Sequence, residues 1–238
     1  MRQRVIKLGL SQSSTIDLLK PLRFIHDFPG SSPLLEWGEL QNISRALPPE
    51  FVEGTVNGLH VNQCPDILSL EGLHSNKVWV MLRNVEQIPS IRVLIENILS
   101  DLNQFEFENA GGVCSPMCYV FISSPYTMVP LHIDPEHNFL FQVSGSKTLY
   151  IDNGGSDLLG GKVLKSFFED EVGYRLHLPQ QVISRFERFE ISSGAGVYIP
   201  VVAPHLVENG GSISVSFSFT FRSKISQDIR RNALKGPL

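Results

Sequence analysis

The apolar positions of this chain change their spacing near residue 115, from helical repeats to short strand-like runs. The clearest helical repeat joins Ile88, Ile91, Leu94, Ile95, Ile98, Leu99 and Leu102. This pattern predicts an amphipathic helix that packs against the outer face of a sheet. A second helix is predicted over residues 34–47, ended by Pro48 and Pro49, and a short one near residues 14–19, ended by Pro21.

Short apolar runs separated by Gly, Pro and Asn dominate the second half of the chain. They cover residues 119–122, 129–133, 139–143, 147–151, 196–199 and 213–221. Many short strands with turn signals predict a mainly β fold of the sandwich or jelly-roll type. One buried strand is predicted earlier, over residues 77–83, whereas residues 53–76 show no clear periodicity. The glycine pairs at 154–155 and 160–161 predict a flexible connection between the two halves of the roll.

These patterns divide the chain into three parts. Residues 1–114 are expected to form a helical and mixed region that packs on the core, residues 115–222 the β core, and residues 223–238 a C-terminal tail. The tail is consistent with a short helix that serves a dimer contact or with a frayed end, and we favour the frayed end. The choice between monomer and homodimer stays open.

Composition and charge narrow the classes of partner. The chain has 238 residues, 42% of them hydrophobic, and a formal net charge of −4, which argues against a broad basic surface for nucleic acid. No stretch approaches the roughly 20 apolar residues of a membrane span, and Lys7 and Gly9 interrupt any signal-peptide core. Three cysteines, an odd count without a second pair, favour reduced thiols. We therefore expect a soluble, cytoplasmic protein with no nucleic-acid or membrane partner.

The candidate chemistry begins in the apolar run 129–134. His132 and Asp134 are two positions apart on a predicted strand, so their side chains point to the same side. With His205 they supply two imidazoles and one carboxylate, the facial set of ligands that holds Fe(II) in non-haem oxygenases. The alternative is that His132 bonds to a backbone group and that Asp134 caps a turn before Pro135. The other histidines lack a partner at ligand spacing and are predicted not to be ligands: His26, His60, His74, His137 and His177.

The residues around this motif resemble a known family. The first ligand pair is followed by Asn138, by Gln142-Val-Ser-Gly145 and by Lys147, and a second segment runs from Gly194 through Pro200, Pro204 and His205 to Asn209. This set is similar to the core of the JmjC and cupin-like 2-oxoglutarate oxygenases, including the asparaginyl hydroxylase that inhibits hypoxia-inducible factor. The resemblance covers roughly residues 115–222.

The resemblance implies a double-stranded β-helix in which His132, Asp134 and His205 hold the metal. It also implies that Lys147 pairs with the distal carboxylate of 2-oxoglutarate and that Asn138 lies near the carboxylate on the metal side. The alternatives are a solvent-facing strand lysine and an ordinary turn asparagine. On the last strand, Ser216 and Ser218 contact the co-substrate if the hydroxyl face points into the barrel, and have no catalytic meaning if it points to solvent.

Two positions depart from the family pattern. Val129 stands where relatives often place Ser or Thr, and Thr127 is the candidate substitute. The segment around Trp79 stands where relatives often supply a Tyr, and Tyr119 is the candidate to reach the site.

The resemblance implies an enzyme that uses Fe(II), 2-oxoglutarate and O₂ to hydroxylate a peptide, protein or amino-acid side chain, or to remove a methyl group by hydroxylating it. The alternatives are a metal cupin enzyme that does not use 2-oxoglutarate and a non-catalytic cupin-like binding module. The substrate itself, peptide, protein or small molecule, has no readable motif in the N-terminal half or in residues 152–171.

Overall fold

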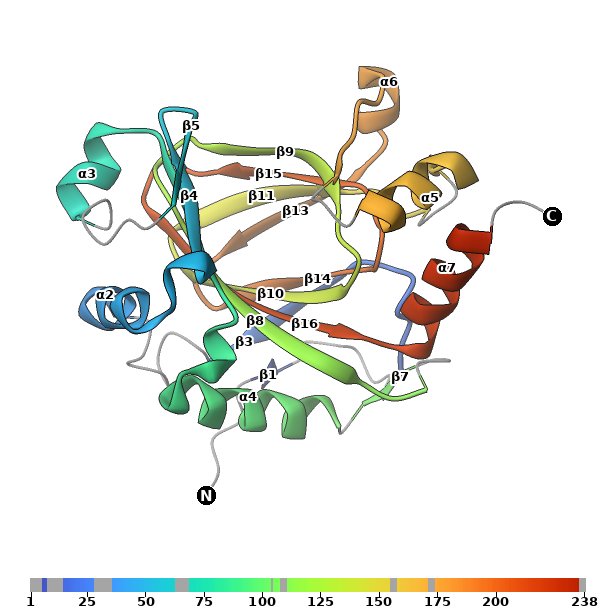
Figure 1. Cartoon of the computed structure of the whole chain (residues 1–238), viewed down its shortest axis with the longest axis horizontal. Coiled ribbons are helices and arrows are strands. Elements are labelled where there is room, and N and C mark those ends of the chain that lie inside the picture. The colour runs from blue at the N-terminus through green and yellow to red at the C-terminus, as the bar shows by residue number, and fades with distance from the viewer. Residues whose placement is uncertain are drawn as a thin grey trace.

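The computed structural model contains two antiparallel sheets that face each other (Figure 1). It describes residues 6–7, 15–27, 36–62, 69–103, 105–107, 111–154, 158–170 and 174–235. The larger sheet has the strand order β1 (Ile6–Lys7), β3 (Leu22–His26), β14 (Ala195–Ile199), β10 (His137–Ser144), β16 (Ser214–Arg222), β8 (Cys114–Ser123), β6 (Val78–Arg83), β4 (Val52–Val56) and β5 (Leu59–Asn62). The smaller sheet has the order β12 (Tyr174–Arg175), β9 (Met128–Ile133), β15 (His205–Asn209), β11 (Ser146–Ile151) and β13 (Glu187–Ser192).

Helices cover the outside of this sandwich. Beneath the larger sheet in Figure 1 lies α4 (Pro89–Leu102), and α2 (Trp37–Ala46) lies beside it. At the opposite end of the sandwich α5 (Gly161–Asp170) contacts α7 (Lys224–Lys235). The remaining short elements are α3 (Leu70–Ser75), α6 (Gln180–Ile183), the 3₁₀ turns Pro49–Phe51 and Val85–Gln87, and the parallel pair β2 (Thr15–Ile16) and β7 (Glu106–Phe107). Within the described residues, no helix is long and apolar enough to cross a membrane.

Eight strands, four from each sheet, form the centre of the fold. Along the chain β8, β10, β14 and β16 belong to the larger sheet, and β9, β11, β13 and β15 belong to the smaller one. The chain passes back and forth between the sheets, which is the jelly-roll or double-stranded β-helix arrangement of cupins and JmjC proteins. The predicted fold class is confirmed. Strands β6, β4 and β5 extend the larger sheet beyond β8, and β3 extends it beyond β14.

The two faces of the larger sheet have opposite chemistry. On β16 the phenylalanines Phe217, Phe219 and Phe221 point outward into the main core cluster, which also contains the apolar face of α4. The hydroxyls of alternate residues, including Ser216 and Ser218, therefore point toward the smaller sheet. The predicted alternation holds, and its hydroxyl face lines the inside of the barrel.

A glycine turn sets the start of the strand that carries Lys147. Gly145 joins β10 to β11 with a φ of +73°, and a Cβ at this position would collide with the backbone carbonyl of Ile213. Only glycine adopts this conformation without a steric cost in so crowded a turn. From there Lys147, Leu149 and Ile151 all point inward, and all three side chains are buried.

Two predictions for regions with mixed patterns were wrong. Residues 15–16 form β2 rather than a helix, because they pair with Glu106 and Phe107 of β7 and bury Ile16 in the main core. The tail is not frayed: residues 224–235 form α7, and Ala233 and Ile229 pack with residues of α5 in one apolar cluster. A neighbouring apolar surface thus supports a helix whose own sequence is mostly polar.

Other elements lay in segments where no pattern was found. Residues 52–62 form the hairpin β4–β5, whose turn Asn57-Gly58 has positive φ at both positions, as a two-residue hairpin turn requires. Residues 161–170, which follow the expected flexible connection between the glycine pairs, form α5 because Leu164, Phe167 and Phe168 bury one side of it. The expected helix near 34–47 and the strand near 77–83 are present as α2 and β6.

Candidate metal centre

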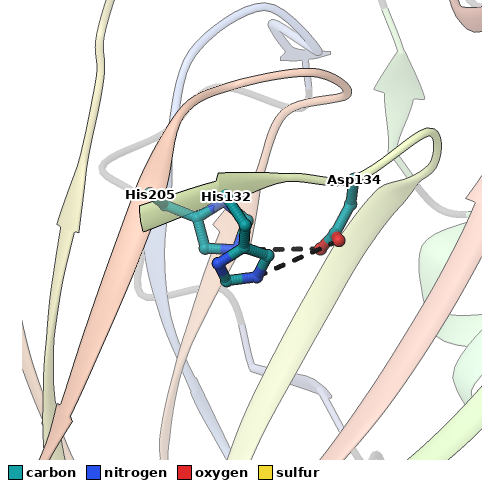
Figure 2. A group of neighbouring side chains, drawn as sticks. All are labelled: His132, Asp134 and His205. Carbon is teal, nitrogen blue, oxygen red and sulfur yellow. Dashed lines mark ion pairs between the residues drawn. The ribbon is translucent and has the colours of Figure 1, made fainter. Parts of the chain in front are cut away.

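Three side chains from the smaller sheet meet at one end of the barrel. His132 lies near the end of β9, Asp134 follows that strand, and His205 is the first residue of β15. Strands β9 and β15 are antiparallel neighbours with His132 opposite His205. Figure 2 shows the two imidazoles side by side with the Asp134 carboxylate directed at them. The pairing of β9 with β15 therefore brings His205 next to His132 and Asp134, although His205 lies far from them in the sequence.

Backbone carbonyls fix the orientation of both imidazole rings. The Nδ1 of His132 lies 2.8 Å from the carbonyl oxygen of Pro130, and the Nδ1 of His205 lies 2.9 Å from that of Ala203. Because a carbonyl only accepts, each Nδ1 carries the proton and donates it. In the neutral form of each ring, Nε2 then carries a lone pair. Second bonds of this kind orient histidine ligands in metal sites.

The lone pairs of the two histidines converge on the carboxylate. The Nε2 of His132 is 4.0 Å from Asp134 Oδ1, and the Nε2 of His205 is 3.6 Å from Asp134 Oδ2. One ligand atom from each residue lies within 4.8 Å of the other two. Burial, and next to it the neighbouring His132, lowers the pKa of His205 to about 4, so this ring is neutral near pH 7. Two imidazoles and one carboxylate fit Fe(II) with open positions on one side.

A strained turn links two of these residues. Val202 has a φ of +52°, an unfavourable conformation for a β-branched residue, and its N–H donates to the carbonyl of Asp134 at 2.9 Å. The Val202 side chain is buried with Phe168 and Ala233, which belong to α5 and α7. The cluster at this end of the barrel thus holds the backbone of Asp134 and the segment before His205 in one arrangement.

A cavity of about 400 Å³ extends from the metal centre between the sheets, and we call it the Lys147 cavity. His132, Asp134 and His205 line it, as does Lys147, and apolar walls come from Trp79, Phe121, Leu140, Ile199 and Val207. Lys147 is only 6% exposed, and burial lowers its pKa to about 7. No described residue forms a hydrogen bond or ion pair with its ammonium group. The cavity thus holds a metal-type site and one buried cation without an anion.

A second cavity, of about 560 Å³, lies on the other side of Asp134, and we call it the Arg222 cavity. It shares five lining residues with the Lys147 cavity: Glu53, Met81, Phe121, Asp134 and Asn138. It contains two pairs of opposite charge. Arg222 donates to Glu136 Oε1 from Nη2 at 2.8 Å, and Arg83 lies 3.8 Å from Glu53. Burial raises the pKa of Glu136, and the hydrogen bond from Arg222 opposes that shift.

The other predicted co-substrate residues occupy several positions. Asn138 lines both cavities and accepts a hydrogen bond from Ser218 at 2.6 Å. Ser218 lines only the Arg222 cavity, and so does Tyr119, whose pKa burial raises to about 12. Ser216 is fully buried and donates to Gln142 at 2.7 Å, so it lines neither cavity. The structure thus brings Asn138 to the metal centre but separates Ser216 and Tyr119 from Lys147.

Thr127 stands outside both cavities. It precedes β9 rather than lying within it, and its hydroxyl donates to the carbonyl of Ser124 at 2.8 Å. Because β9 begins at Met128, Thr127 does not share the inward face of that strand with Val129 and cannot take the place expected for it. Its hydroxyl instead accepts a hydrogen bond at 3.0 Å from Asn209, a cavity residue.

Sequence reasoning assigned no site role to several residues that line the cavities. Two of them, Trp79 and Phe121, form a stacked row with the predicted Tyr119, with ring centroids 6.2 Å apart in each neighbouring pair. Asn209 lines the Lys147 cavity, and Glu136 and Arg222 line the other. The inward parity of β6 and β8 was a usable signal for the aromatic row. Among the non-ligand predictions, His137 is buried and bonded to Tyr198 and Ser223.

Comparison with known proteins supports the fold through structure alone. No family model matches the chain, and no curated protein sequence matches it. The chain is similar to an X-ray structure of Escherichia coli YcfD, with a TM-score of 0.56 and 14% identity over 94% of this chain. It is also similar to YcfD, described as a ribosomal oxygenase, in complex with cobalt and 2-oxoglutarate, with a TM-score of 0.52 and 16% identity over 92% of this chain.

The chain spans just over half of these proteins, 56% and 53% of the two YcfD chains. At this identity the likeness establishes the cupin and JmjC-like fold. A particular likeness to the asparaginyl hydroxylase is not among these matches. The likeness thus shows the fold, and within that fold His132, Asp134 and His205 form a group that could hold a metal ion.

Proposed function

We propose that this chain is an Fe(II)- and 2-oxoglutarate-dependent oxygenase that hydroxylates a side chain of a peptide, protein or amino acid. The observation that carries the proposal is the joint arrangement of one metal-type centre and one buried ammonium group in a single cavity. Related folds accommodate many functions, so the proposal rests on this site rather than on the fold. The similar YcfD structure that holds cobalt and 2-oxoglutarate supports the same choice of ligands.

The buried cation argues for an acidic co-substrate. Lys147 is 6% exposed in a cavity with largely apolar walls, and burial of a charge without a partner is unfavourable. A dicarboxylate solves this problem, because one carboxylate pairs with Lys147 while the other end reaches the metal centre. Bound iron with this co-substrate and O₂ supplies the oxidising power to functionalise a C–H bond. The chain contributes orientation of the ligands, the pairing charge and exclusion of water.

The substrate is proposed to enter through the Arg222 cavity. That cavity meets the metal centre at Asp134 and Asn138, which also line the Lys147 cavity. Its volume of about 560 Å³ exceeds that of a single amino-acid side chain, which favours a peptide segment or a small molecule of comparable size. It combines two pairs of opposite charge with aromatic walls, which suits a polar chain with apolar parts.

The test is formation of succinate from 2-oxoglutarate by purified protein with Fe(II) and ascorbate. Wild type is expected to form succinate slowly without its substrate, and Asp134→Ala to fall to the protein-free rate. The Lys147→Ala variant separates the proposal from a metal cupin that does not use 2-oxoglutarate, since only the proposed oxygenase requires the ammonium group. Absence of both Fe(II) binding and 2-oxoglutarate binding in wild type would overturn the proposal in favour of a non-catalytic module.

A further inference from the structure

One buried polar atom beside Lys147 has no hydrogen-bond partner among the described residues. Asn209 is 6% exposed and lines the Lys147 cavity, and its Oδ1 accepts no hydrogen bond from that part of the chain. Most buried polar side-chain atoms have a partner, so an exception in a cavity indicates a missing ligand, a water or a rearranged neighbour. Asn209 Oδ1 is therefore a buried acceptor, in a residue that lines the cavity, for which a donor is expected.

The orientation of the Asn209 amide is fixed by its other end. Its Nδ2 donates to the backbone carbonyl of Thr127 and to the Thr127 hydroxyl, both at 3.0 Å. A carbonyl cannot donate, so the amide cannot be flipped without losing this bond. The Thr127 hydroxyl is itself directed to the carbonyl of Ser124 at 2.8 Å. Oδ1 is therefore held away from Thr127 by two anchored hydrogen bonds.

Strand pairing places Asn209 directly opposite Lys147. Lys147 on β11 and Asn209 on β15 are direct partners in the antiparallel register. Directly opposite residues point to the same face, with Cβ atoms roughly 4.5–5.5 Å apart. Lys147 has three N–H donors and no partner among the described residues, and Asn209 has one acceptor without a donor.

We propose that Asn209 is a positioning residue for the co-substrate, and that it acts through Lys147. When a dicarboxylate binds, Asn209 Oδ1 accepts one N–H of the Lys147 ammonium group, and the other two donors are directed at the distal carboxylate. Thr127 supports the same arrangement indirectly by fixing the amide, although its own hydroxyl stays outside the cavity. This inference rests on the proposed function and adds to it the residue that confers selectivity for a 2-oxo acid with a second carboxylate.

The decisive variant is Asn209→Asp, which keeps the shape of the side chain but adds a negative charge. The new carboxylate pairs with Lys147 and competes with the distal carboxylate of 2-oxoglutarate. We expect the dissociation constant for 2-oxoglutarate to rise ~100-fold, as when a charged hydrogen-bonded pair is broken. The dissociation constant for 2-oxovalerate, which lacks the second carboxylate, should change less than ~3-fold, because it makes no such pair. Both constants are measured by calorimetric titration of Mn(II)-loaded protein.

Two further variants separate positioning from plain structural support. Asn209→Ala is expected to weaken binding of the co-substrate ~10-fold, the scale of one charge-assisted hydrogen bond, and to raise KM more than it lowers kcat. Thr127→Val should weaken binding of the co-substrate by part of that amount. Thr127→Ser, which keeps the hydroxyl, should bind the co-substrate as wild type does. Glu208→Gln is the matched control, because Glu208 is exposed on the opposite face of β15 and should leave both constants unchanged.

The outcomes distinguish this inference from the proposed function. If Asn209→Asp keeps the wild-type ratio of the two dissociation constants while Lys147→Ala loses 2-oxoglutarate binding, the role of Asn209 is wrong and the proposed function stands. If metal-loaded wild type binds no 2-oxoglutarate, both are overturned. A variant that is less stable but retains the wild-type ratio indicates a structural role for Asn209 and also rejects the inference. Metal affinity of each variant verifies that the site is intact.

Discussion

The Lys147 cavity and the Arg222 cavity share the wall around Asp134 but differ in whether their buried charges are paired. In the first, apolar side chains surround a single buried cation that has no anion among the described residues. In the second, the guanidinium groups of Arg222 and Arg83 lie against Glu136 and Glu53. An unpaired charge in an apolar space either gains a partner from a ligand or is lost by a change of protonation, whereas paired charges are already satisfied by the protein.

This difference assigns a different role to each cavity. The Lys147 cavity is suited to one small, charged molecule that is bound in every cycle. The Arg222 cavity needs no ligand for its own stability, which suits a substrate that comes and goes. We therefore expect a change in the shared wall to affect both cavities, and a change deep in one cavity to leave the other intact.

The largest effect is expected from the shared wall. Asp134→Ala removes one of three ligand groups, so metal affinity should fall by more than the ~10–100-fold that changes to outer-shell residues cause. Turnover should then fall to background. Isothermal titration with Fe(II) under argon, or with Mn(II) in air, measures the loss. Asp228→Ala, a carboxylate on the surface of α7, is the matched control. Metal affinity in Asp134→Ala equal to that of the control would remove Asp134 from the centre.

The next largest effect should be confined to the Lys147 cavity. Lys147→Ala removes the partner of the distal carboxylate, which costs about 2–5 kcal/mol for a buried charge pair, or roughly 30- to 4000-fold in the Michaelis constant for the co-substrate. Metal affinity should be unchanged, because Lys147 is not a ligand. Steady-state kinetics and the same metal titration test both statements. An equal loss of metal affinity would mean that the two ends of the cavity are not independent.

A change in the Arg222 cavity should affect stability before it affects the co-substrate. Arg222→Ala leaves the Glu136 carboxylate, which is 7% exposed, without its partner. The cost should be about 1–3 kcal/mol of unfolding free energy, since Arg222 itself is partly exposed. Urea unfolding measures it, and the double variant with Glu136→Gln should recover most of the loss. A raised Michaelis constant for the co-substrate in Arg222→Ala would contradict the separation of the cavities.

The smallest effect is a pH dependence that only the Lys147 cavity should show. Burial lowers the pKa of Lys147 to about 7, so the free protein loses its ammonium proton as the pH rises through that value. Binding of a carboxylate requires the protonated form, so binding of 2-oxoglutarate should weaken above pH 7, by at most about tenfold per pH unit. Below pH 7 this group should contribute no further change. Titrations of metal-loaded protein with 2-oxoglutarate between pH 6 and 9 test this. In Lys147→Arg, the binding of 2-oxoglutarate should change much less above pH 7.

Local spacing predicted much of the β core and the first part of the centre. The period of two placed His132 and Asp134 together, and it placed the hydroxyls of β16 on one face. Spacing did not predict which cavity each inward residue lines, because that depends on position along a strand rather than on parity. Tyr119 and Phe121 both point inward from β8, yet only Phe121 also lines the Lys147 cavity.

The elements that the apolar spacing did not predict share one property, which is that each buries only one side. The strand β13 alternates buried Phe189 and Ile191 with exposed charged residues, so its mean polarity hides a clear period of two. Helices α5 and α7 each bury one side mainly against the other and against the turn around Val202. Their stability comes from tertiary packing of an apolar face, which is larger than the contribution of intrinsic helix propensity.

The sequence alone determined that two ligand-type side chains would share one side of a strand, and that a jelly roll would carry them, since alternation is a local property of the backbone. Only the tertiary structure decided that His205 lies opposite His132, that Asn209 lies opposite Lys147, and that Thr127 remains outside the cavity. Strand pairing joins residues far apart in the chain, and its register depends on turns and bulges, such as the shift between His205 and Val207. No spacing within a single strand encodes that register.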